Sequence, residues 1–322
     1  MKFLEKQIIK YKNTSLRIVY YHVISDDNPD YYFSDKALTI KSFREHIKFF
    51  KKNYDVISLE EALYLASQNK TLKKKLVITF DDGFKGNYSL IAPILNDAKI
   101  TATFFIISSC LDNADLMWRN KILLFEKYKK ENIHRVLEDV SNEFKLEKPT
   151  SKQDILQWSL ASWPMKDKEQ IVNKIWKLLM PFSLKEYLIK ESPYCSTEEI
   201  KELSNAGFGI GSHSHTHPIF SKLNYEDFSN EILICSNILT SIIGKEISCF
   251  SYPFGIRSSN EFEKKFCKST SRSWTFLGTK NRLNNYTNNF ETWERDNVEF
   301  SNFQMKLRFV YLPVFRSLIN KK

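Results

Sequence analysis

The 322-residue sequence contains no unbroken run of about 18 apolar residues, the length that a membrane-spanning helix requires. Its first stretch, MKFLEKQIIKYKNTSLRIVYYHV, is interrupted by charged residues every few positions. It lacks the apolar core and the small-residue cleavage site of a signal peptide. We therefore expect a soluble protein that is not exported.

Cysteine pairing motifs are also missing. The sequence has five cysteines, an odd number, and no CxxC pattern. Paired cysteines are typical of exported proteins, whereas unpaired ones are typical of reducing compartments. The cysteines therefore predict reduced, structural thiols and a cytoplasmic location.

The charge is unbalanced, but no nucleic-acid-binding motif accompanies the excess. The formal net charge is +10 and the pI is about 9.1. Such a balance admits nucleic acid, a membrane surface or a phosphorylated substrate as a partner. The basic residues are mostly scattered among acidic ones, and no RNA- or DNA-binding signature is present. We expect no nucleic-acid partner.

Short strand-like and helical segments alternate along most of the chain. Strands are predicted at residues 16–23, 55–58, 75–80, 101–107, 207–213, 248–255, 273–276 and 292–298. Apolar residues recur at helical spacing from Thr39 to Phe50, and Ser58 with Glu61 forms a capping box for a further helix. The alternation indicates an α/β fold with parallel strands, and about seven or eight strands favour a (β/α) barrel over an open sheet.

Residues 111–200 interrupt this alternation. They contain no convincing strand, while segments such as KEQIVNKIWKLLM have helical periodicity. No linker-like run of Gly, Ser or Pro flanks them. We therefore expect one barrel over residues 1–301 with a helical insertion at about 111–200, followed by a tail at 302–322.

Polar residues follow several of the predicted strands. Asp81 and Asp82 follow residues 75–80, a histidine cluster ends the strand near residue 212, and His22 lies near the end of the first strand. In parallel β/α folds, functional side chains gather at the carboxyl ends of the strands. Two imidazoles and one carboxylate suit a catalytic zinc or a similar divalent ion.

The cluster contains three of the chain's six histidines, at positions 213, 215 and 217. All three would share a face if the strand continued, whereas His213 and His217 would share one if the chain turned into a helix. Pro218 and the neighbouring Ser and Thr residues favour a turn. We therefore predict His213 and His217 as ligands, with His215 pointing elsewhere.

The two aspartates are also expected to have different roles. An Asp-Asp-Gly sequence alone usually marks a turn, so its meaning depends on the histidines. Asp81 and Asp82 would point in opposite directions on a strand, but Gly83 permits a sharp turn that brings both to one centre. One carboxylate would then bind the metal while the other accepts a proton from water.

These motifs resemble those of a known family. TFDDG at 79–83 followed by HSHTHP at 213–218 is similar to the polysaccharide deacetylases, carbohydrate esterase family 4, which includes chitin and peptidoglycan deacetylases. The similarity extends over most of residues 16–300. It implies a distorted (β/α) barrel and metal-dependent hydrolysis of acetyl groups on sugars.

The resemblance also implies residue roles. By position, Asp81 matches the family's catalytic base. The positions of its metal ligands are matched by Asp82, His213 and His217. His215 falls at a variable position, in agreement with the geometric argument.

Two family motifs are altered. The third commonly reads Arg-x-Pro-Tyr, whereas the matching residues are Ser251-Tyr252-Pro253-Phe254. The arginine that orients the base is therefore absent, and we predict that Arg295, near the end of a late strand, replaces it. A late Leu-x-His motif usually supplies the general acid, yet no histidine follows His217. His22 is our candidate for that role.

Three residues are candidates for binding substrate: Tyr252, Phe254 and Trp118. A backbone N–H near Phe254 would hold the oxyanion of the tetrahedral intermediate. Trp118 and Arg119 open the insertion, where an aromatic ring could stack on a sugar and an arginine could recognise carboxylate or phosphate. Packing of Trp118 between insertion and barrel is at least as good an explanation.

The sequence therefore predicts a hydrolase that removes acetyl groups from N-acetylated sugars in polysaccharide or glycolipid biosynthesis. One alternative is an O-acetyl ester or N-formyl hydrolase acting on a glycan. Another is a catalytically weak glycan-binding protein, because the usual arginine and late histidine are missing. Retention of both aspartates and of both predicted ligand histidines argues against the last.

The tail at 302–322 carries five cationic residues and no acidic one, with apolar residues at helical spacing. It predicts either an amphipathic helix on anionic lipid or a helix docked on the barrel. The expected partner is an acetylated glycan or a lipid-linked sugar. If the tail binds lipid, the location would be the inner face of the cell membrane.

Overall fold

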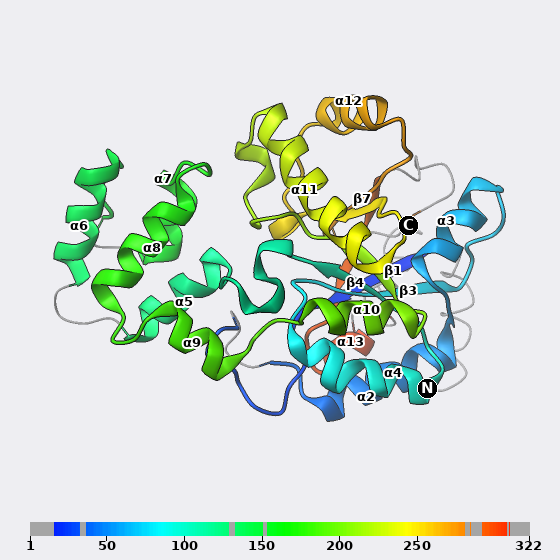
Figure 1. Cartoon of the computed structure of the whole chain (residues 1–322). Helices are drawn as coiled ribbons and strands as arrows, with labels where there is room; N and C mark the ends of the chain where they lie inside the picture. The colour runs from blue at the N-terminus through cyan, green and yellow to red at the C-terminus, as the bar shows by residue number, and fades with distance from the viewer. Residues whose placement is uncertain are drawn as a thin grey trace, which may run out of the picture.

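Short parallel strands rich in aromatic and β-branched residues form the centre of the fold (Figure 1). The computed structural model describes residues 16–32, 37–128, 133–150, 153–280, 284, 292–307 and 309. The strands are β1 (Arg17–Tyr21), β2 (Asp55–Val56), β3 (Lys75–Phe80), β4 (Thr103–Ile106), β5 (Gly209–Ser212), β6 (Cys249–Ser251), β7 (Thr275–Gly278), β8 (Thr292–Glu294) and β9 (Asp296–Asn297). Their order is β8-β7-β6-β5-β4-β3-β1-β9, with β2 paired to β3, and all these pairings are parallel.

The two ends of this sheet meet at β8 and β9. β8 pairs with β7, β9 pairs with β1, and only Arg295 separates the two segments. Counted as one strand, they leave eight parallel strands in a nearly closed barrel. The ring is distorted at β3, because β2 pairs with its start at Lys75 and β4 with its end at Thr79. The fold class predicted from the alternating segments is therefore confirmed.

Helices surround the barrel. They are α2 (Ile40–Asn53), α3 (Leu59–Ser67), α4 (Ala92–Ala98), α10 (Thr197–Asn205), α11 (Tyr225–Ile243), α12 (Asn260–Thr270) and α13 (Asn302–Lys306). The side chain of Ser58 accepts the N–H of Glu61 and so begins α3 where the sequence predicted a cap. α2 buries Phe43, Ile47 and Phe50 at helical spacing.

After β4 and before α10 and β5, the chain forms a group of five helices, which lies to the left in Figure 1. They are α5 (Trp118–Tyr128), α6 (Ile133–Phe144), α7 (Ile155–Ser162), α8 (Lys168–Leu179) and α9 (Leu184–Glu191). Their apolar faces form a cluster that includes Trp118 and Trp158. The same cluster contains Phe84 and Ile107, which follow barrel strands. Continuous apolar packing therefore joins these helices to the barrel at the carboxyl ends of β3 and β4.

Part of the C-terminal tail packs on the barrel. Met305 and Phe309 are buried in the main core, while Phe303 is 71% exposed. Residues 308 and 310–322 of the predicted lipid-binding tail lie outside the described residues. Within the described part of the chain, we find no helix with both the length and the apolar character needed to cross a membrane.

Close packing inside the barrel makes Gly211 on β5 a test of the fold. A Cβ atom there would lie 2.4 Å from Phe105 Cε1 and 2.9 Å from Cys249 Sγ, whereas one at Gly86 would meet nothing within 4 Å. We predict that Gly211→Ala lowers the free energy of unfolding by about 1–3 kcal/mol. Gly86→Ala, at a helical backbone position, should change it by less than about 1 kcal/mol. Urea denaturation followed by tryptophan fluorescence measures both, and equal midpoints would contradict the packing argument.

Candidate active site

Five polar residues meet at the carboxyl ends of the strands. Asp81 and Asp82 follow β3, His213 follows β5, His22 follows β1, and Arg295 separates β8 from β9. Parallel strands bring their carboxyl ends to the same rim, so residues far apart in sequence converge there. A pocket of about 410 Å³ opens at this rim and is lined by four of them: His22, Asp81, Asp82 and His213.

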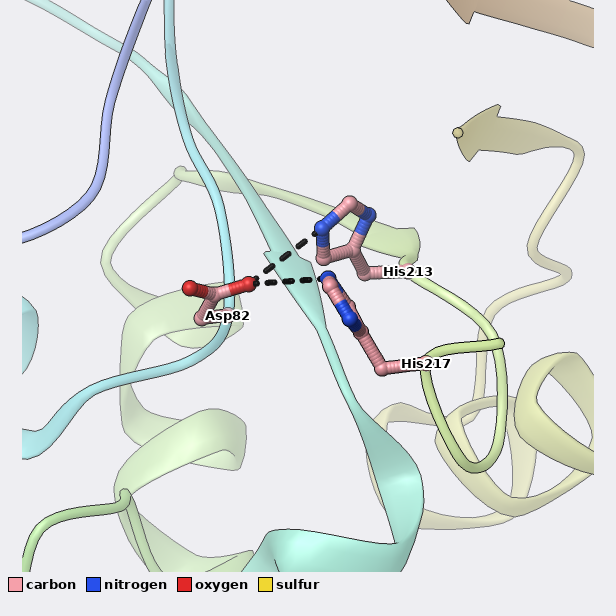
Figure 2. Close-up of side chains that lie close together, drawn as sticks. All are labelled: Asp82, His213 and His217. Carbon is pink, nitrogen blue, oxygen red and sulfur yellow. Dashed lines mark ion pairs between the residues drawn. The ribbon is translucent and has the colours of Figure 1, made fainter. Parts of the chain in front are cut away.

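Asp82, His213 and His217 form a compact, buried group. Figure 2 shows both imidazoles pointing toward the Asp82 carboxylate. Asp82 Oδ1 lies 3.3 Å from His213 Nε2 and 3.6 Å from His217 Nε2. The three possible ligand atoms lie within 4.8 Å of one another. A turn after each strand creates this geometry, because Asp82 has φ 73° and His217 has φ 56°, both in the left-handed region.

The hydrogen bonds of this group fit a metal ion. His213 Nδ1 lies 2.8 Å from the Ser251 carbonyl and must donate to it, which leaves the Nε2 lone pair facing Asp82. Asp82 Oδ1 is buried, yet no described residue donates a hydrogen bond to it. A buried carboxylate oxygen of this kind is costly unless a cation satisfies it. Two imidazoles and a carboxylate are a donor set that suits zinc or a similar divalent ion.

The protonation states also fit. Burial raises the pKa of Asp82, but contributions led by the adjacent His213 and the charge of His22 outweigh it, so the pKa lies below its ordinary value. Burial, and then the proximity of His213, hold the pKa of His217 well below its ordinary value. An ionised carboxylate and a neutral imidazole are the forms that bind a metal.

His215 points away from this group, as the sequence argument predicted. Its Nδ1 lies 2.9 Å from the hydroxyl of Ser108. Its backbone N–H and that of Thr216 donate to Glu231 on α11. The middle histidine of the motif therefore helps to hold the loop.

Asp81 makes a bidentate pair with Arg295. The two guanidinium nitrogens lie 2.7 and 2.8 Å from the two carboxylate oxygens. Burial raises the pKa of Asp81, but the charge of Arg295, its hydrogen bonds and the nearby histidines together lower it by more, so the pKa falls below its ordinary value. The carboxylate is therefore ionised at neutral pH and can accept a proton. The structure thus brings Arg295 to the residue that the sequence argument assigned to it.

Arg295 occupies space left by a small residue on β6. It is fully buried, with its guanidinium carbon 4.8 Å from the Tyr20 ring centre and 5.5 Å from that of Phe105. The guanidinium also donates to the Ser251 hydroxyl at 2.5 Å. Ser251 is the residue that matches the arginine of the family's third motif. The guanidinium that contacts Asp81 therefore comes from the β8–β9 segment instead of from β6.

His22 is held by Glu299, a residue that the sequence analysis missed. His22 Nδ1 lies 2.8 Å from Glu299 Oε2, and the His22 backbone N–H donates to Oε1 at 2.6 Å. Burial lowers the pKa of His22, but the charge and hydrogen bond of Glu299, together with the charges of Asp82 and Asp81, raise it by more, to about 9. The imidazole is therefore protonated at neutral pH while its side chain keeps 27% exposure. No local sequence pattern indicates this pair, because the two residues are 277 positions apart.

The three predicted substrate-binding residues occupy different places. Phe254 lines the pocket, and its ring centre lies 4.8 Å from that of His217. Tyr252 also contributes to the wall, but it is 1% exposed and its hydroxyl donates to Glu263. Trp118 is fully buried and does not line the pocket; its indole N–H donates to the His217 carbonyl at 2.8 Å. This corrects the stacking role expected for Trp118, because its ring is covered by the insertion.

Comparison with known proteins identifies the family. The family model described as polysaccharide deacetylase matches residues 68–157 and 158–266. YxkH of Bacillus subtilis (strain 168), named as a polysaccharide deacetylase, is 33% identical over 102 residues, 31% of this chain and 34% of that protein. The poly-beta-1,6-N-acetyl-D-glucosamine N-deacetylase of Staphylococcus aureus (strain N315) is 32% identical over 111 residues, 31% of this chain and 38% of that protein. The alignments thus span only about a third of the relatives' length.

Solved structures share the fold. The Streptococcus pyogenes deacetylase PplD, in complex with acetate, has a TM-score of 0.58 at 14% identity, covering 89% of this chain and 94% of that one. IcaB from Ammonifex degensii has a TM-score of 0.57 at 16% identity, covering 88% and 92%. At these identities the likeness shows the fold alone.

The geometry of the candidate metal site predicts which histidines matter for metal content. Zinc-reconstituted protein should contain about one ion per chain. His217→Ala should lose most of it, because one of three ligand atoms is removed. His215→Ala is the matched control and should keep it, because that ring faces Ser108. Elemental analysis after dialysis measures both, and equal zinc contents would contradict the assignment.

Proposed function

The chain belongs to the polysaccharide deacetylase family, and from this we propose that it hydrolyses the N-acetyl group of an acetylated sugar in polysaccharide or glycolipid biosynthesis. One observation carries the proposal: Asp81, held by Arg295, lines the same pocket as the Asp82–His213–His217 group. A carboxylate fixed beside three metal-ligand side chains is the arrangement that metal-assisted hydrolysis requires.

The proposed ion is zinc, held by Asp82, His213 and His217. When bound, it would lower the pKa of a water molecule and polarise the acetyl carbonyl. The support for this choice is the mixed nitrogen and oxygen donor set and the His213 hydrogen bond to the Ser251 carbonyl, which directs Nε2 toward the site.

Asp81 acts as the general base in this proposal. It accepts a proton from the attacking water as the new C–O bond forms at the acetyl carbon. Arg295 acts as a positioning residue, because its two parallel hydrogen bonds fix the plane of the carboxylate. It also keeps Asp81 ionised before the reaction.

His22 acts as the general acid. When the C–N bond breaks, the amine nitrogen needs a proton, because an amide anion is a poor leaving group. His22 is protonated at neutral pH and lines the pocket, and Glu299 orients its ring. The backbone N–H groups of Tyr252 and Gly255 donate to protein carbonyls, so we assign the oxyanion contact to the N–H of Phe254. The products are acetate and an amino sugar.

The alternatives differ in what they require of His22. Ester hydrolysis expels an alcohol, which depends less on an acid than an amine does. A glycan-binding protein would need neither a protonated histidine nor an oriented carboxylate. The His22–Glu299 pair therefore favours amide hydrolysis over O-acetyl ester hydrolysis and over binding alone.

We also place the reaction in the cytoplasm. The support is that none of the five cysteines forms a disulfide bond, and three of them are buried. Membrane contact through the tail is not needed by this proposal, since Met305 and Phe309 already pack on the barrel.

The first test is acetate release from a panel of N-acetylated and O-acetylated glycans after chelation and zinc restoration. We predict zinc-dependent release from an N-acetylated glycan. Asp81→Asn should lower kcat by about 100-fold or more with unchanged zinc content, because the base is lost. Asp97→Asn, an exposed site on α4, is the control. Release only from O-acetylated glycans would support the ester alternative, and no release from any substrate would contradict the proposal.

The pH dependence tests the acid. Glu299, with smaller contributions from Asp82 and Asp81, raises the pKa of His22 to about 9, so the acid form is present below that pH and kcat should fall as pH rises through it. In Glu299→Gln the descending limb should move toward neutral pH by about one unit or more. Glu261→Gln, exposed on α12, should leave it in place. A limb that does not move in Glu299→Gln would remove His22 from the role of acid.

A further inference from the structure

Lys168 is a buried lysine of the helical insertion that the proposed reaction does not use. It is the first residue of α8, and its side chain is 4% exposed. Lys168 Nζ lies 3.3 Å from Glu169 Oε1 and donates a hydrogen bond to the Thr216 hydroxyl at 2.6 Å. Burial of an ammonium group is costly unless such partners are present. Thr216 immediately precedes His217, so the contact reaches the loop that carries a candidate metal ligand.

The Thr216 hydroxyl joins Lys168 to Glu231 on α11. A lysine ammonium can only donate and a carboxylate oxygen can only accept. The hydroxyl therefore accepts from Lys168 and donates to Glu231 Oε1, at 2.5 Å. Glu231 Oε2 also accepts the backbone N–H groups of His215 and Thr216, at 2.9 and 2.8 Å. The loop is thus held between a helix of the barrel and a helix of the insertion.

The two candidate ligand histidines are held by different parts of the molecule. His213 follows β5 directly, and its Nδ1 bonds to the Ser251 carbonyl on β6. At the other histidine, the insertion supplies the contacts. The Trp118 indole N–H donates to the His217 carbonyl at 2.8 Å, and Lys168 holds the preceding residue. The barrel therefore positions one imidazole, and the insertion helps to position the other.

The backbone of this loop needs support. His217 has φ 56° and Ser214 has φ 71°, both in the left-handed region that is costly for residues other than glycine. Such a backbone persists only while the surrounding contacts fix it. If these contacts were weakened, the metal-free loop would populate other conformations. Zinc binding would then have to restore the competent one, which lowers the apparent affinity.

We propose that the helical insertion sets the zinc affinity of the site, with Lys168 as a positioning residue that acts on His217 through Thr216. This role rests on the metal centre of the proposed function and is independent of the identity of the sugar. Residues that orient metal ligands typically change the metal affinity by about 10- to 100-fold. The insertion is then a working part of the metal centre as well as a cover packed on the barrel.

The test measures the zinc dissociation constant by competition with a chromophoric chelator. Thr216→Val and Lys168→Met each remove one partner of the hydrogen bond and should raise the constant about 10-fold. Thr216→Ser keeps the hydroxyl and should bind zinc nearly as tightly as the wild type. Lys174→Met is the matched control, because Lys174 lies on the same helix and pairs with Glu143 on α6. It should leave the constant unchanged.

Two further readouts separate positioning from general stability. The double variant Lys168→Met/Thr216→Val should bind zinc no more weakly than the weaker single variant, because both changes remove the same bond. In the metal-free protein, amide hydrogen exchange over residues 213–219 should be faster in Lys168→Met than in Lys174→Met. Urea denaturation of each metal-free variant reports its stability, and a lower midpoint with an unchanged zinc constant would indicate a structural role only.

The proposal is wrong if folded Lys168→Met and Thr216→Val bind zinc as tightly as the wild type. It is also wrong if Lys174→Met or Thr216→Ser weakens binding as much, because the hydrogen bond would then not be the cause. If one of the two test variants does not fold, the other decides. Acetate release by the wild type is measured separately. Zinc binding that depends on Lys168 without acetate release would overturn the proposed function alone, whereas a wild type that binds no zinc would overturn both.

Discussion

The buried pair of Asp81 and Arg295 is the interaction on which the site depends. Both side chains are almost inaccessible to water, so each charge is tolerable only while the other is in place. Asp81 follows β3, and Arg295 lies where β8 ends and β9 begins. The pair therefore forms only when the barrel closes, and closure in turn buries the pair. The closure of the barrel and the position of Asp81, the proposed base, therefore depend on each other.

The same closing segment positions His22, the proposed acid. β9 pairs with β1 in parallel register, with Val19 opposite Asp296 and Tyr20 opposite Asn297. Continuing that register beyond both strands brings Glu299 beside His22, and their side chains meet at 2.8 Å. Strand segment 292–297 thus carries the guanidinium that pairs with Asp81, the proposed base, and leads to the carboxylate that raises the pKa of His22, the proposed acid. A shift of this segment would disturb both groups together.

This dependence explains what could be predicted from the sequence. The strand alternation and the Asp-Asp and His-x-x-x-His spacings are local patterns, so the barrel and the convergence of Asp82, His213 and His217 could be inferred. Arg295 could be proposed because it ends a recognisable strand. Glu299 could not, because its partner lies 277 positions away and only the register of β1 with β9 brings them together. The burial of Trp118 depends on how the insertion packs, which helical periodicity does not specify.

Ser251 and Arg295 show how a guanidinium that contacts Asp81 can be supplied by a different strand. A long side chain at that position would occupy the space where the Arg295 guanidinium now donates to the Ser251 hydroxyl. The small side chain of Ser251 on β6 leaves the space that Arg295 fills, so the two residues are sterically complementary. Asp81, the proposed base, keeps a guanidinium partner although the third motif of this chain lacks the usual arginine. The guanidinium charge therefore comes from a different strand than in the family motif, and it still lowers the pKa of Asp81.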